Sequence, residues 1–274
     1  MYQVSLTPKS ILPVLALLGM LGIGKGPVLM AQGNAAVLSK YSAELFSGPS
    51  GSVIPYRLLS PDGVEQGKRY PLVLFLHGAG ERGSDNGKQL VHAAVDFASP
   101  ERMRQFPAFV AFPQCPEEQR WVESPWDLPS GRGEFDKNPS KPMKAALELV
   151  DSLIKNHPVD PARVYVTGLS MGGQGAWYAA AAKPRRFAAM LEVCGGGDPT
   201  WAADYQGMPI WALHGQNDSV VPISRAREMV VALTKGGHAP ELRYTEYPGV
   251  GHNSWAQTFK RADVFEWLFA QRKP

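Results

Sequence analysis

The segment that most constrains the fold is a β-branched run that leads directly into a glycine-rich turn around one serine. Residues 163–168 read RVYVTG, and the chain continues from Gly168 to Gly172 as GLSMG before a helix-like run, GGQGAWYAAAA. β-Branched residues favour strands, and glycines permit turns that are too tight for larger side chains. The segment therefore predicts a buried strand that ends in a sharp turn and passes straight into a helix.

The same alternation of strand and helix continues along most of the chain. Short apolar runs predict strands at 52–61, 70–78, 108–114, 187–193, 209–215 and 241–247, and helical periodicity predicts helices at 141–157, 223–235 and 255–271. Ser140 is the expected N-cap of the helix at 141–157. This alternation is typical of a mostly parallel sheet with helices on both faces. Because no Pro/Gly/Ser-rich linker divides the pattern, we expect one α/β domain over residues 38–274.

The N-terminal segment carries the features of an export signal. Lys9 precedes an apolar run at 11–24, and several small residues follow at 31–36. A basic region, an apolar core and small residues in this order predict a secretory signal peptide. The alternative, a membrane anchor, needs about 20 unbroken apolar residues, whereas Lys25 interrupts this run. We expect residues 1–31 to be cleaved, which predicts a secreted or periplasmic protein with no stable membrane anchor.

Composition and motifs argue against several other functional classes. The 274-residue chain is 44% hydrophobic and 19% charged, with a formal net charge of +3. The expected cleavage removes two lysines and no acidic residue, and no Lys/Arg cluster is interleaved with aromatic residues, so we expect no nucleic-acid partner. The sequence has no HExxH or paired CxxC motif, and we assign the glycines of GAGERG at 78–83 to a tight turn after a strand rather than to dinucleotide binding, so we expect no metal or other cofactor. Cys115 and Cys194 are too few for a disulfide framework, and we favour free thiols.

The serine turn has two potential partners farther along the chain. GLSMG between a strand and a helix is the context of a nucleophile elbow, which exposes Ser170 at the edge of the sheet. Asp218 follows the strand at 209–215, and His252 follows the strand at 241–247. Taken singly, Asp218 would be a turn former and His252 an ordinary loop histidine. Their order and their place beyond strand ends instead predict a catalytic triad in which His252 is the base and Asp218 orients it.

A hydrolytic triad also requires donors that stabilise the oxyanion. The first is expected to be the backbone N–H of Met171, directly after Ser170. The second is expected from Ala79, in the glycine-rich turn HGAGERG that follows the strand at 70–78. His77 and His214 each precede a glycine at a strand end, and we interpret both as structural residues.

Several stretches together resemble a known family. These are YRLLSP, YPLVLFLHGAGERGSDN, AFPQCPE, GLSMGGQGAWYAA, CGGGDP, HGQNDSVVP, GHNSW and VFEWLFAQR. They resemble secreted bacterial esterases of the α/β-hydrolase superfamily, related to polyhydroxybutyrate depolymerases and feruloyl or acetyl-xylan esterases and labelled phospholipase/carboxylesterase or "predicted peptidase". The resemblance implies an α/β-hydrolase fold, a small-molecule or oligomeric ester substrate, and catalytic positions at Ser170, Asp218 and His252. It also implies that Ala79 and Met171 form the oxyanion hole.

The segment between Cys115 and the helix at 141–157 is long and has no regular pattern, which is typical of functional loops. Trp121 and Trp126 in this loop would either wall the substrate site or fasten the loop to the domain, and both interpretations stay open. The sequence thus predicts a serine carboxylesterase. The alternatives are a serine peptidase acting on short peptides and an inactive binding protein of the same fold.

Overall fold

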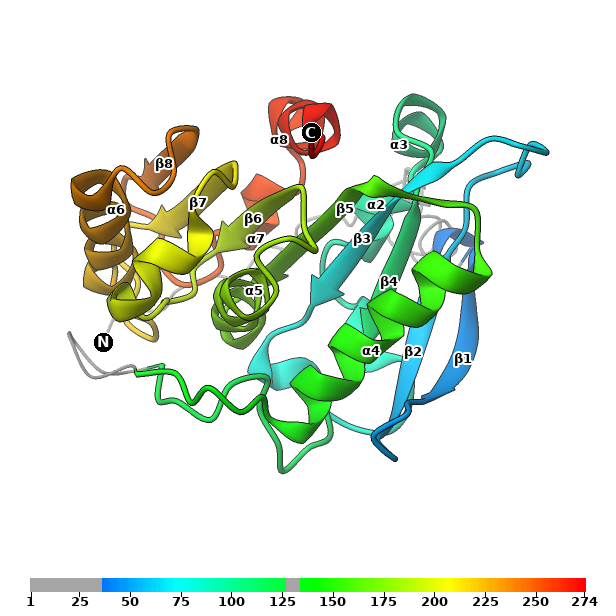
Figure 1. Cartoon of the computed structure of the whole chain (residues 1–274), viewed down its shortest axis with the longest axis horizontal. Coiled ribbons are helices and arrows are strands. Elements are labelled where there is room, and N and C mark those ends of the chain that lie inside the picture. The colour runs from blue at the N-terminus through cyan, green and yellow to red at the C-terminus, as the bar shows by residue number, and fades with distance from the viewer. Residues whose placement is uncertain (1–35, 127–133) are drawn as a thin grey trace, which may run out of the picture.

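A single central sheet organises the computed structural model, which describes residues 36–126 and 134–274. Its strands are β1 (Tyr41–Ser47), β2 (Val53–Leu59), β3 (Tyr70–Leu76), β4 (Phe109–Pro113), β5 (Val159–Leu169), β6 (Ala189–Val193), β7 (Ile210–Gly215) and β8 (Leu242–Tyr247). They lie in the order β1-β2-β4-β3-β5-β6-β7-β8 (Figure 1). Within the described ranges β2 alone runs against the other strands. The predicted mostly parallel sheet is therefore confirmed.

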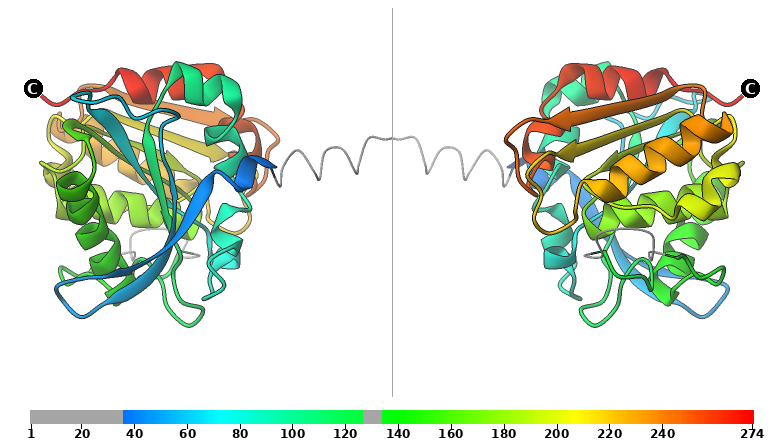
Figure 2. Two further views of the ribbon diagram at one scale, coloured as in Figure 1. Left: turned by 90° about the vertical axis from the view of Figure 1, so that its right-hand side faces the viewer. Right: turned by 90° about the vertical axis from the view of Figure 1, so that its left-hand side faces the viewer.

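Helices cover both faces of this sheet, as predicted. They are α2 (Ala94–Phe97), α3 (Pro100–Gln105), α4 (Lys141–Asn156), α5 (Met171–Ala182), α6 (Ser224–Gly236), α7 (Trp255–Thr258) and α8 (Ala262–Ala270), with short 3₁₀ turns η1 (Ala79–Glu81), η2 (Lys88–Leu90) and η3 (Pro199–Tyr205). Helices α4, α5 and α6 lie on one face, and α2, α3, α7 and α8 lie on the other (Figures 1 and 2). This is the α/β-hydrolase arrangement expected from the sequence.

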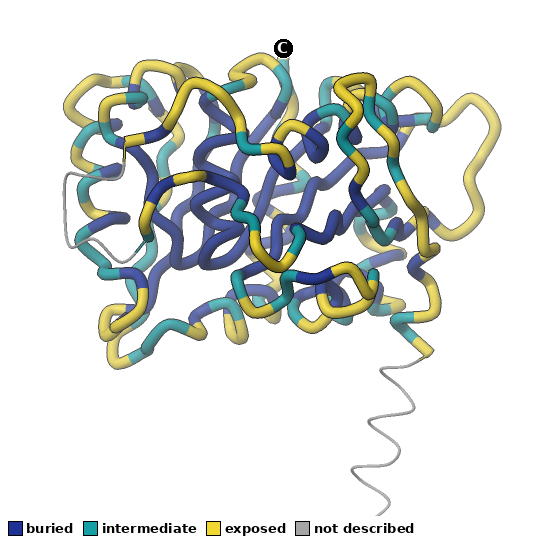
Figure 3. Tube along the Cα trace, turned by 90° about the horizontal axis from the view of Figure 1, so that it is seen from below, coloured by how far each residue is buried: buried dark blue, intermediate teal, exposed yellow. Residues whose placement is uncertain are grey.

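The core consists of two apolar layers, one on each side of the sheet. Successive side chains of β3 point to opposite faces of the sheet. Leu72 and Leu74 pack towards α4 and α5, whereas Val73 and Phe75 pack towards α2 and α8. All residues of β3 are buried, which explains the unbroken apolar run in its sequence. Figure 3 shows the buried strands at the centre, with exposed residues confined to the periphery. The sheet is therefore a rigid base for the loops at its edge.

Two of the predicted elements differ from expectation. The strand expected from residue 163 begins earlier, because β5 starts at Val159 and its register against β3 shifts between Tyr70 and Leu72. The closing helix expected over 255–271 is interrupted between α7 and α8. Phe259 and Val264 are both buried on the same side of the sheet, but five residues along one helix are separated by roughly 140°. The interruption lets both side chains reach the same apolar layer.

The two cysteines are free and buried, as favoured from the sequence. Cys115 follows β4 and Cys194 follows β6, and two other strands, β3 and β5, lie between these strands in the sheet. This separation places the thiols too far apart for a disulfide without rearrangement of the sheet.

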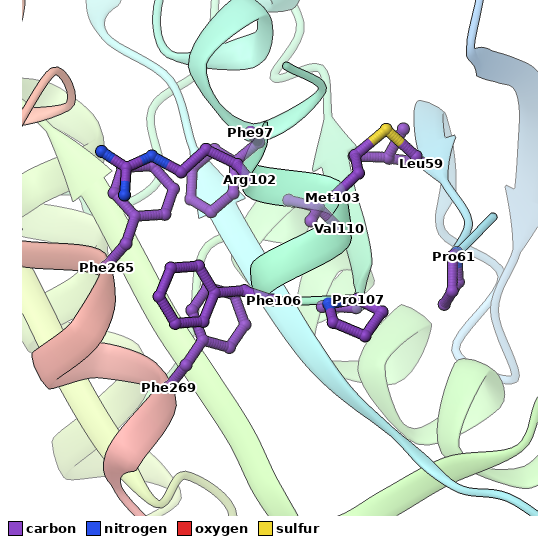
Figure 4. A pocket seen from close by; sticks show the side chains of 11 residues that line it. Leu59, Pro61, Phe97, Arg102, Met103, Phe106, Pro107, Val110, Phe265 and Phe269 are labelled. Carbon is purple, nitrogen blue, oxygen red and sulfur yellow. The ribbon is translucent and has the colours of Figure 1, made fainter. Parts of the chain in front are cut away.

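On the face that α3 and α8 cover, aromatic side chains pack between these two helices. Figure 4 shows a small pocket there, in which the Phe106 and Phe269 rings stack with centroids 5.0 Å apart. The Arg102 guanidinium lies 4.3 Å from the centroid of the Phe265 ring. Across residues 36–126 and 134–274, no helix combines the length and the apolar character that crossing a membrane requires.

Candidate active site

Ser170 occupies the sharp turn between β5 and α5, as the motif predicts. Its backbone has φ 55° and ψ −121°, a conformation that costs a non-glycine residue about 1–3 kcal/mol. The turn brings α5 so close to β3 that a Cβ at Gly172 would overlap the carbonyl oxygen of Leu76. Glycine at this position therefore allows the strand-to-helix turn that lifts Ser170 to the edge of the sheet.

The loops after β7 and β8 bring Asp218 and His252 to the same edge. The N–H of Asn217 donates to the carbonyl of Val250 at 2.8 Å, which ties the two loops together. Asp218 also forms a turn of its own, because its Oδ1 accepts from the N–H groups of Val220 and Val221, each at 2.9 Å. Asp218 is thus a turn former through its Oδ1, and its Oδ2 can make a different contact.

The three predicted residues form one continuous hydrogen-bonded chain. Ser170 Oγ lies 2.8 Å from His252 Nε2, and His252 Nδ1 lies 2.8 Å from Asp218 Oδ2. Since a carboxylate oxygen only accepts, Nδ1 carries the hydrogen, and Nε2 is left to accept from the serine hydroxyl. The arrangement can remove a proton from Ser170 and stabilise the resulting imidazolium.

The environment of Asp218 keeps its carboxyl ionised. Burial raises the pKa of Asp218, but hydrogen bonds from His214 and His252, together with those from the Val220 and Val221 N–H groups, outweigh it. The net effect holds this pKa well below its usual range. The acid therefore remains a carboxylate throughout the physiological range of pH.

The predicted oxyanion donors lie on either side of Ser170. Met171 is the first residue of α5, so its N–H has no acceptor within the helix, and the positive end of the helix dipole lies at the same place. Ala79 begins η1 and follows Gly78, where an added Cβ would lie 3.6 Å from Ser170 Cβ. Both backbone segments thus border the serine, and the oxyanion role of their N–H groups stays a prediction.

His77 fixes the η1 turn, in agreement with the structural role predicted for it. Its Nε2 accepts from the N–H of Cys115 at 2.9 Å, so Nδ1 carries the hydrogen that it donates to the Gly78 carbonyl at 2.6 Å. Burial lowers the pKa of His77 to about 4, which keeps the ring neutral and this tautomer fixed.

The two loop tryptophans have different environments. Trp121 is fully buried, and its Nε1 donates to the His77 carbonyl at 3.0 Å. Of the two interpretations left open, the structure supports the one in which Trp121 fastens the loop to the domain, because its buried ring offers no surface to a substrate. Trp126 is half-buried, and the Arg120 guanidinium lies 4.5 Å from its ring centroid. A substrate contact by Trp126 stays a prediction.

Two neighbours of the triad were not assigned to it from the sequence. The Trp255 ring meets the His252 ring edge-on, with centroids 5.2 Å apart. His214 is fully buried, and its Nε2 lies 3.2 Å from Asp218 Oδ2. The i,i+4 spacing of His214 and Asp218 was visible in the sequence, but a contact across a loop turn cannot be inferred from spacing alone.

One group of ligand-type atoms lies close together in the described ranges. Single ligand atoms of Cys194, Asp218 and His252 all lie within 4.8 Å of one another. Asp218 and His252 are already joined by a hydrogen bond, and burial raises the pKa of the Cys194 thiol well above its usual range. This chemistry favours a neutral thiol behind the triad over a thiolate ligand for a metal ion.

Comparison with known proteins gives a consistent result. A 38% identical thermostable esterase of known structure superposes with a TM-score of 0.78 over 87% of this chain and 64% of its own. Poly(3-hydroxyalkanoate) depolymerase C of Paucimonas lemoignei is 27% identical over 62% of this chain and 38% of its own. A ferulic acid esterase from Anaeromyces mucronatus, solved with ferulic acid, has a TM-score of 0.59 over 84% of this chain and 90% of its own, but its 15% identity shows the fold alone.

This chain thus spans well under half of the curated depolymerase and slightly less than two thirds of the esterase of known structure. A match to a family model covers about three quarters of this chain. Residues 64–266, which include the serine turn and both loops, match the phospholipase/carboxylesterase model. The chain therefore belongs to the phospholipase/carboxylesterase family of α/β-fold hydrolases.

Proposed function

We propose that this protein is a serine carboxylesterase that works through an acyl-enzyme intermediate. The observation that carries the proposal is the continuous chain from Ser170 Oγ through His252 to Asp218, with both hydrogen bonds at 2.8 Å. A serine hydroxyl is a weak nucleophile unless an adjacent base accepts its proton. The geometry supplies that base together with a buried carboxylate that orients it.

In the acylation step, Ser170 Oγ attacks the ester carbonyl while His252 Nε2 accepts the hydroxyl proton. The carbonyl oxygen becomes an oxyanion beside the N–H groups of Met171 and Ala79, which stabilise it. The tetrahedral intermediate then collapses, and His252 returns the proton to the departing alcohol. Asp218 holds the imidazole in place and stabilises its positive charge throughout.

In the deacylation step, water replaces the alcohol. His252 accepts a proton from the water, which attacks the acyl carbonyl, and the oxyanion forms again beside the same two N–H groups. Collapse releases the carboxylic acid and returns the proton to Ser170. His252 thus acts first as a base and then as an acid in each step, and water is the only added reactant.

The substrate class and location follow from different observations. The depolymerase relative acts, by its name, on a poly(3-hydroxyalkanoate), which supports a carboxylic ester of a small or oligomeric alcohol as the substrate. The apolar N-terminal segment with its preceding lysine supports export, so that the mature enzyme would meet such esters outside the cytoplasm. Its cleavage site, expected near Ala31, lies outside the described residues.

A peptidase is the second candidate within the same chemistry. A triad of this kind can also cleave amide bonds. The inactive binding protein is disfavoured because none of the three triad residues is replaced. The carboxylesterase hypothesis is preferred because the matching family is that of phospholipases and carboxylesterases and the 38% identical protein of known structure is an esterase.

The proposal is tested with a p-nitrophenyl ester series from acetate to octanoate, together with a feruloyl ester. Wild type should hydrolyse at least one ester, with a preferred acyl group, and Ser170→Ala should lose at least about 10³-fold in kcat. Turnover of peptide amides but no ester would favour the peptidase. A folded wild type that cleaves neither substrate class would favour the binding protein.

A further inference from the structure

His214 is a buried histidine that the proposed chemistry does not use. It lies near the end of β7 and is fully buried. Its Nε2 is 2.9 Å from the carbonyl oxygen of Val221 and 3.2 Å from Asp218 Oδ2. Both of these oxygens are acceptors, so Nε2 carries a hydrogen and donates it to the two together. The ring is thereby fixed to both ends of the Asp218 turn.

Asp218 consequently lies between two imidazoles. Its Oδ2 accepts from His252 Nδ1 at 2.8 Å and from His214 Nε2 at 3.2 Å. Its Oδ1 accepts from the two backbone N–H groups of the turn. The carboxylate has four donors around it, and rotation would break at least one of these contacts. The contact with His214 acts on the same oxygen that holds His252.

Acidic side chains flank His214 on both neighbouring strands. Glu246 of β8 is its register partner, and Glu192 of β6 lies in register with Ala212, two residues earlier on the same face. Glu192 is fully buried, and its Oε1 accepts from the Gly195 N–H. Glu246 is held by Arg227 at 2.7 Å. Other titratable groups also face this cluster: Tyr205 interacts with Glu192, Tyr244 interacts with Glu246, and Cys194 and His252 lie beside Asp218.

Packing alone does not explain this cluster. Among residues 36–126 and 134–274, His214 Nδ1 is buried and has no hydrogen-bond partner, and such a group destabilises a fold relative to an apolar side chain of similar size. A leucine at 214 would fill the space and leave Val221 and Asp218 with fewer donors. The feature that a histidine supplies here and a leucine does not is the Nε2 hydrogen directed at Asp218.

We propose that His214 is a positioning residue that holds Asp218 Oδ2 in line with His252 and draws negative charge from that oxygen. The inference rests on the proposed triad and deepens it. With the second donor present, Oδ2 accepts less strongly from His252. Without the His214 donor, the Asp218 carboxylate is free to rotate. Its Oδ2 then accepts from His252 alone and stabilises the imidazolium form of His252 more strongly.

The kinetic test compares two substitutions at this position. His214→Leu removes the donor, whereas the side-chain amide of His214→Gln can donate in place of Nε2. With p-nitrophenyl acetate, His214→Leu should lower kcat by about ten- to a hundredfold with little change in KM. Its acid limb in the pH–kcat profile should move to higher pH. His214→Gln should retain most of the kcat and the wild-type limb.

Circular dichroism and thermal unfolding establish that each variant is folded before its kinetics are compared. A folded His214→Leu with wild-type kcat and an unmoved acid limb would overturn the proposal. Equal impairment of the Leu and Gln variants, with an unmoved limb in both, would also overturn it, because that result indicates a role in packing alone.

A second test uses nuclear magnetic resonance and does not depend on whether the His214 variants fold. Wild type and Asp218→Asn, labelled with ¹⁵N-histidine, should differ in the ring N–H signals of both His252 and His214, because both donate to the same oxygen. An unchanged His214 signal would refute the contact. If wild type hydrolyses no ester, the proposed function fails, and this measurement alone then decides whether His214 holds Asp218.

Discussion

At the scale of single residues, the site depends on a strained serine and a shared carboxylate. Ser170 is held at φ 55° by its neighbours on both sides, and Asp218 is fixed by donors on both oxygens. Neither residue relaxes readily, because the backbone around the first and the hydrogen bonds around the second determine their geometry. Preorganisation of this kind avoids rearrangement during the reaction.

The first prediction concerns Asp218. Asp218→Asn should lower kcat by about 10³- to 10⁴-fold with a small change in KM, because an amide favours the wrong tautomer of His252. Steady-state hydrolysis of the preferred p-nitrophenyl ester measures the effect. Asp204→Asn, at an exposed position, is the matched control and should be indistinguishable from wild type. More than a tenth of the wild-type kcat in Asp218→Asn would contradict the assignment.

A second residue-scale prediction concerns the contact between α5 and β3. A Cβ at Gly172 would overlap the Leu76 carbonyl oxygen, which belongs to backbone in the centre of the sheet. Gly172→Ala should therefore destabilise the protein by about 3 kcal/mol or more, measured by urea unfolding. Gly80→Ala is the control, because a Cβ there meets open space, and its unfolding midpoint should stay close to wild type.

At the scale of elements, local sequence signals determine where helices begin, and side-chain contacts connect each helix to the neighbouring loops. Ser140 caps α4 by accepting from the Met143 N–H at 3.2 Å, as its position predicted. Its hydroxyl also donates to the Trp121 carbonyl at 2.8 Å. One serine thus joins the start of α4 to the loop whose tryptophan fastens the η1 turn.

The third prediction follows from these two bonds. Ser140→Ala should lower the free energy of unfolding by about 1–2 kcal/mol and should also lower the esterase kcat modestly, because the Trp121 loop is released. Ser140→Thr keeps the hydroxyl and should restore both quantities. Chemical unfolding and ester hydrolysis measure them together. A Ser140→Thr variant as unstable as Ser140→Ala would show that the hydroxyl is not the stabilising group.

At the scale of the whole molecule, the sheet carries a buried carboxyl whose protonation is linked to folding. Burial raises the pKa of Glu192 to about 7, although His214 and the Gly195 N–H oppose the shift. The folded protein therefore binds a proton between pH of about 4.5 and 7 that the unfolded chain has already lost. The contribution of Glu192 to the free energy of unfolding is fully present below about pH 4.5 and is lost as the pH rises through about 7.

The fourth prediction tests this linkage. Glu192→Gln removes the charge and keeps an oxygen that can accept from Gly195, so the fall in stability between pH 5 and pH 8 should become smaller. The difference from wild type at pH 8 should be at most about 3 kcal/mol, measured by urea unfolding at both pH values. The exposed Glu241→Gln should leave the wild-type pH dependence intact. An equal fall in wild type and Glu192→Gln would contradict the linkage.

Sequence patterns were sufficient for the parallel strands and the long helices, but not for the edges of the fold. β3, β4 and β7 are fully buried, so their continuous apolar runs identify them directly. β1 is mostly exposed, so its residues show no comparable pattern and it was not predicted. The final helix was predicted as continuous because helical periodicity does not show that Phe259 and Val264 must reach one apolar layer.

The sequence by itself determined the buried parallel strands, the long helices and the three residues now placed in one hydrogen-bonded chain. These depend on local chemistry: burial of apolar runs, glycines at a tight turn and polar residues just beyond strand ends. Only the tertiary structure decided that Trp121 is buried, that the turn at Gly78 lies beside Ser170, and that His214 shares Asp218 with His252. Those relations arise between segments far apart in the chain or across a turn, where packing of the sheet and loops sets the distances.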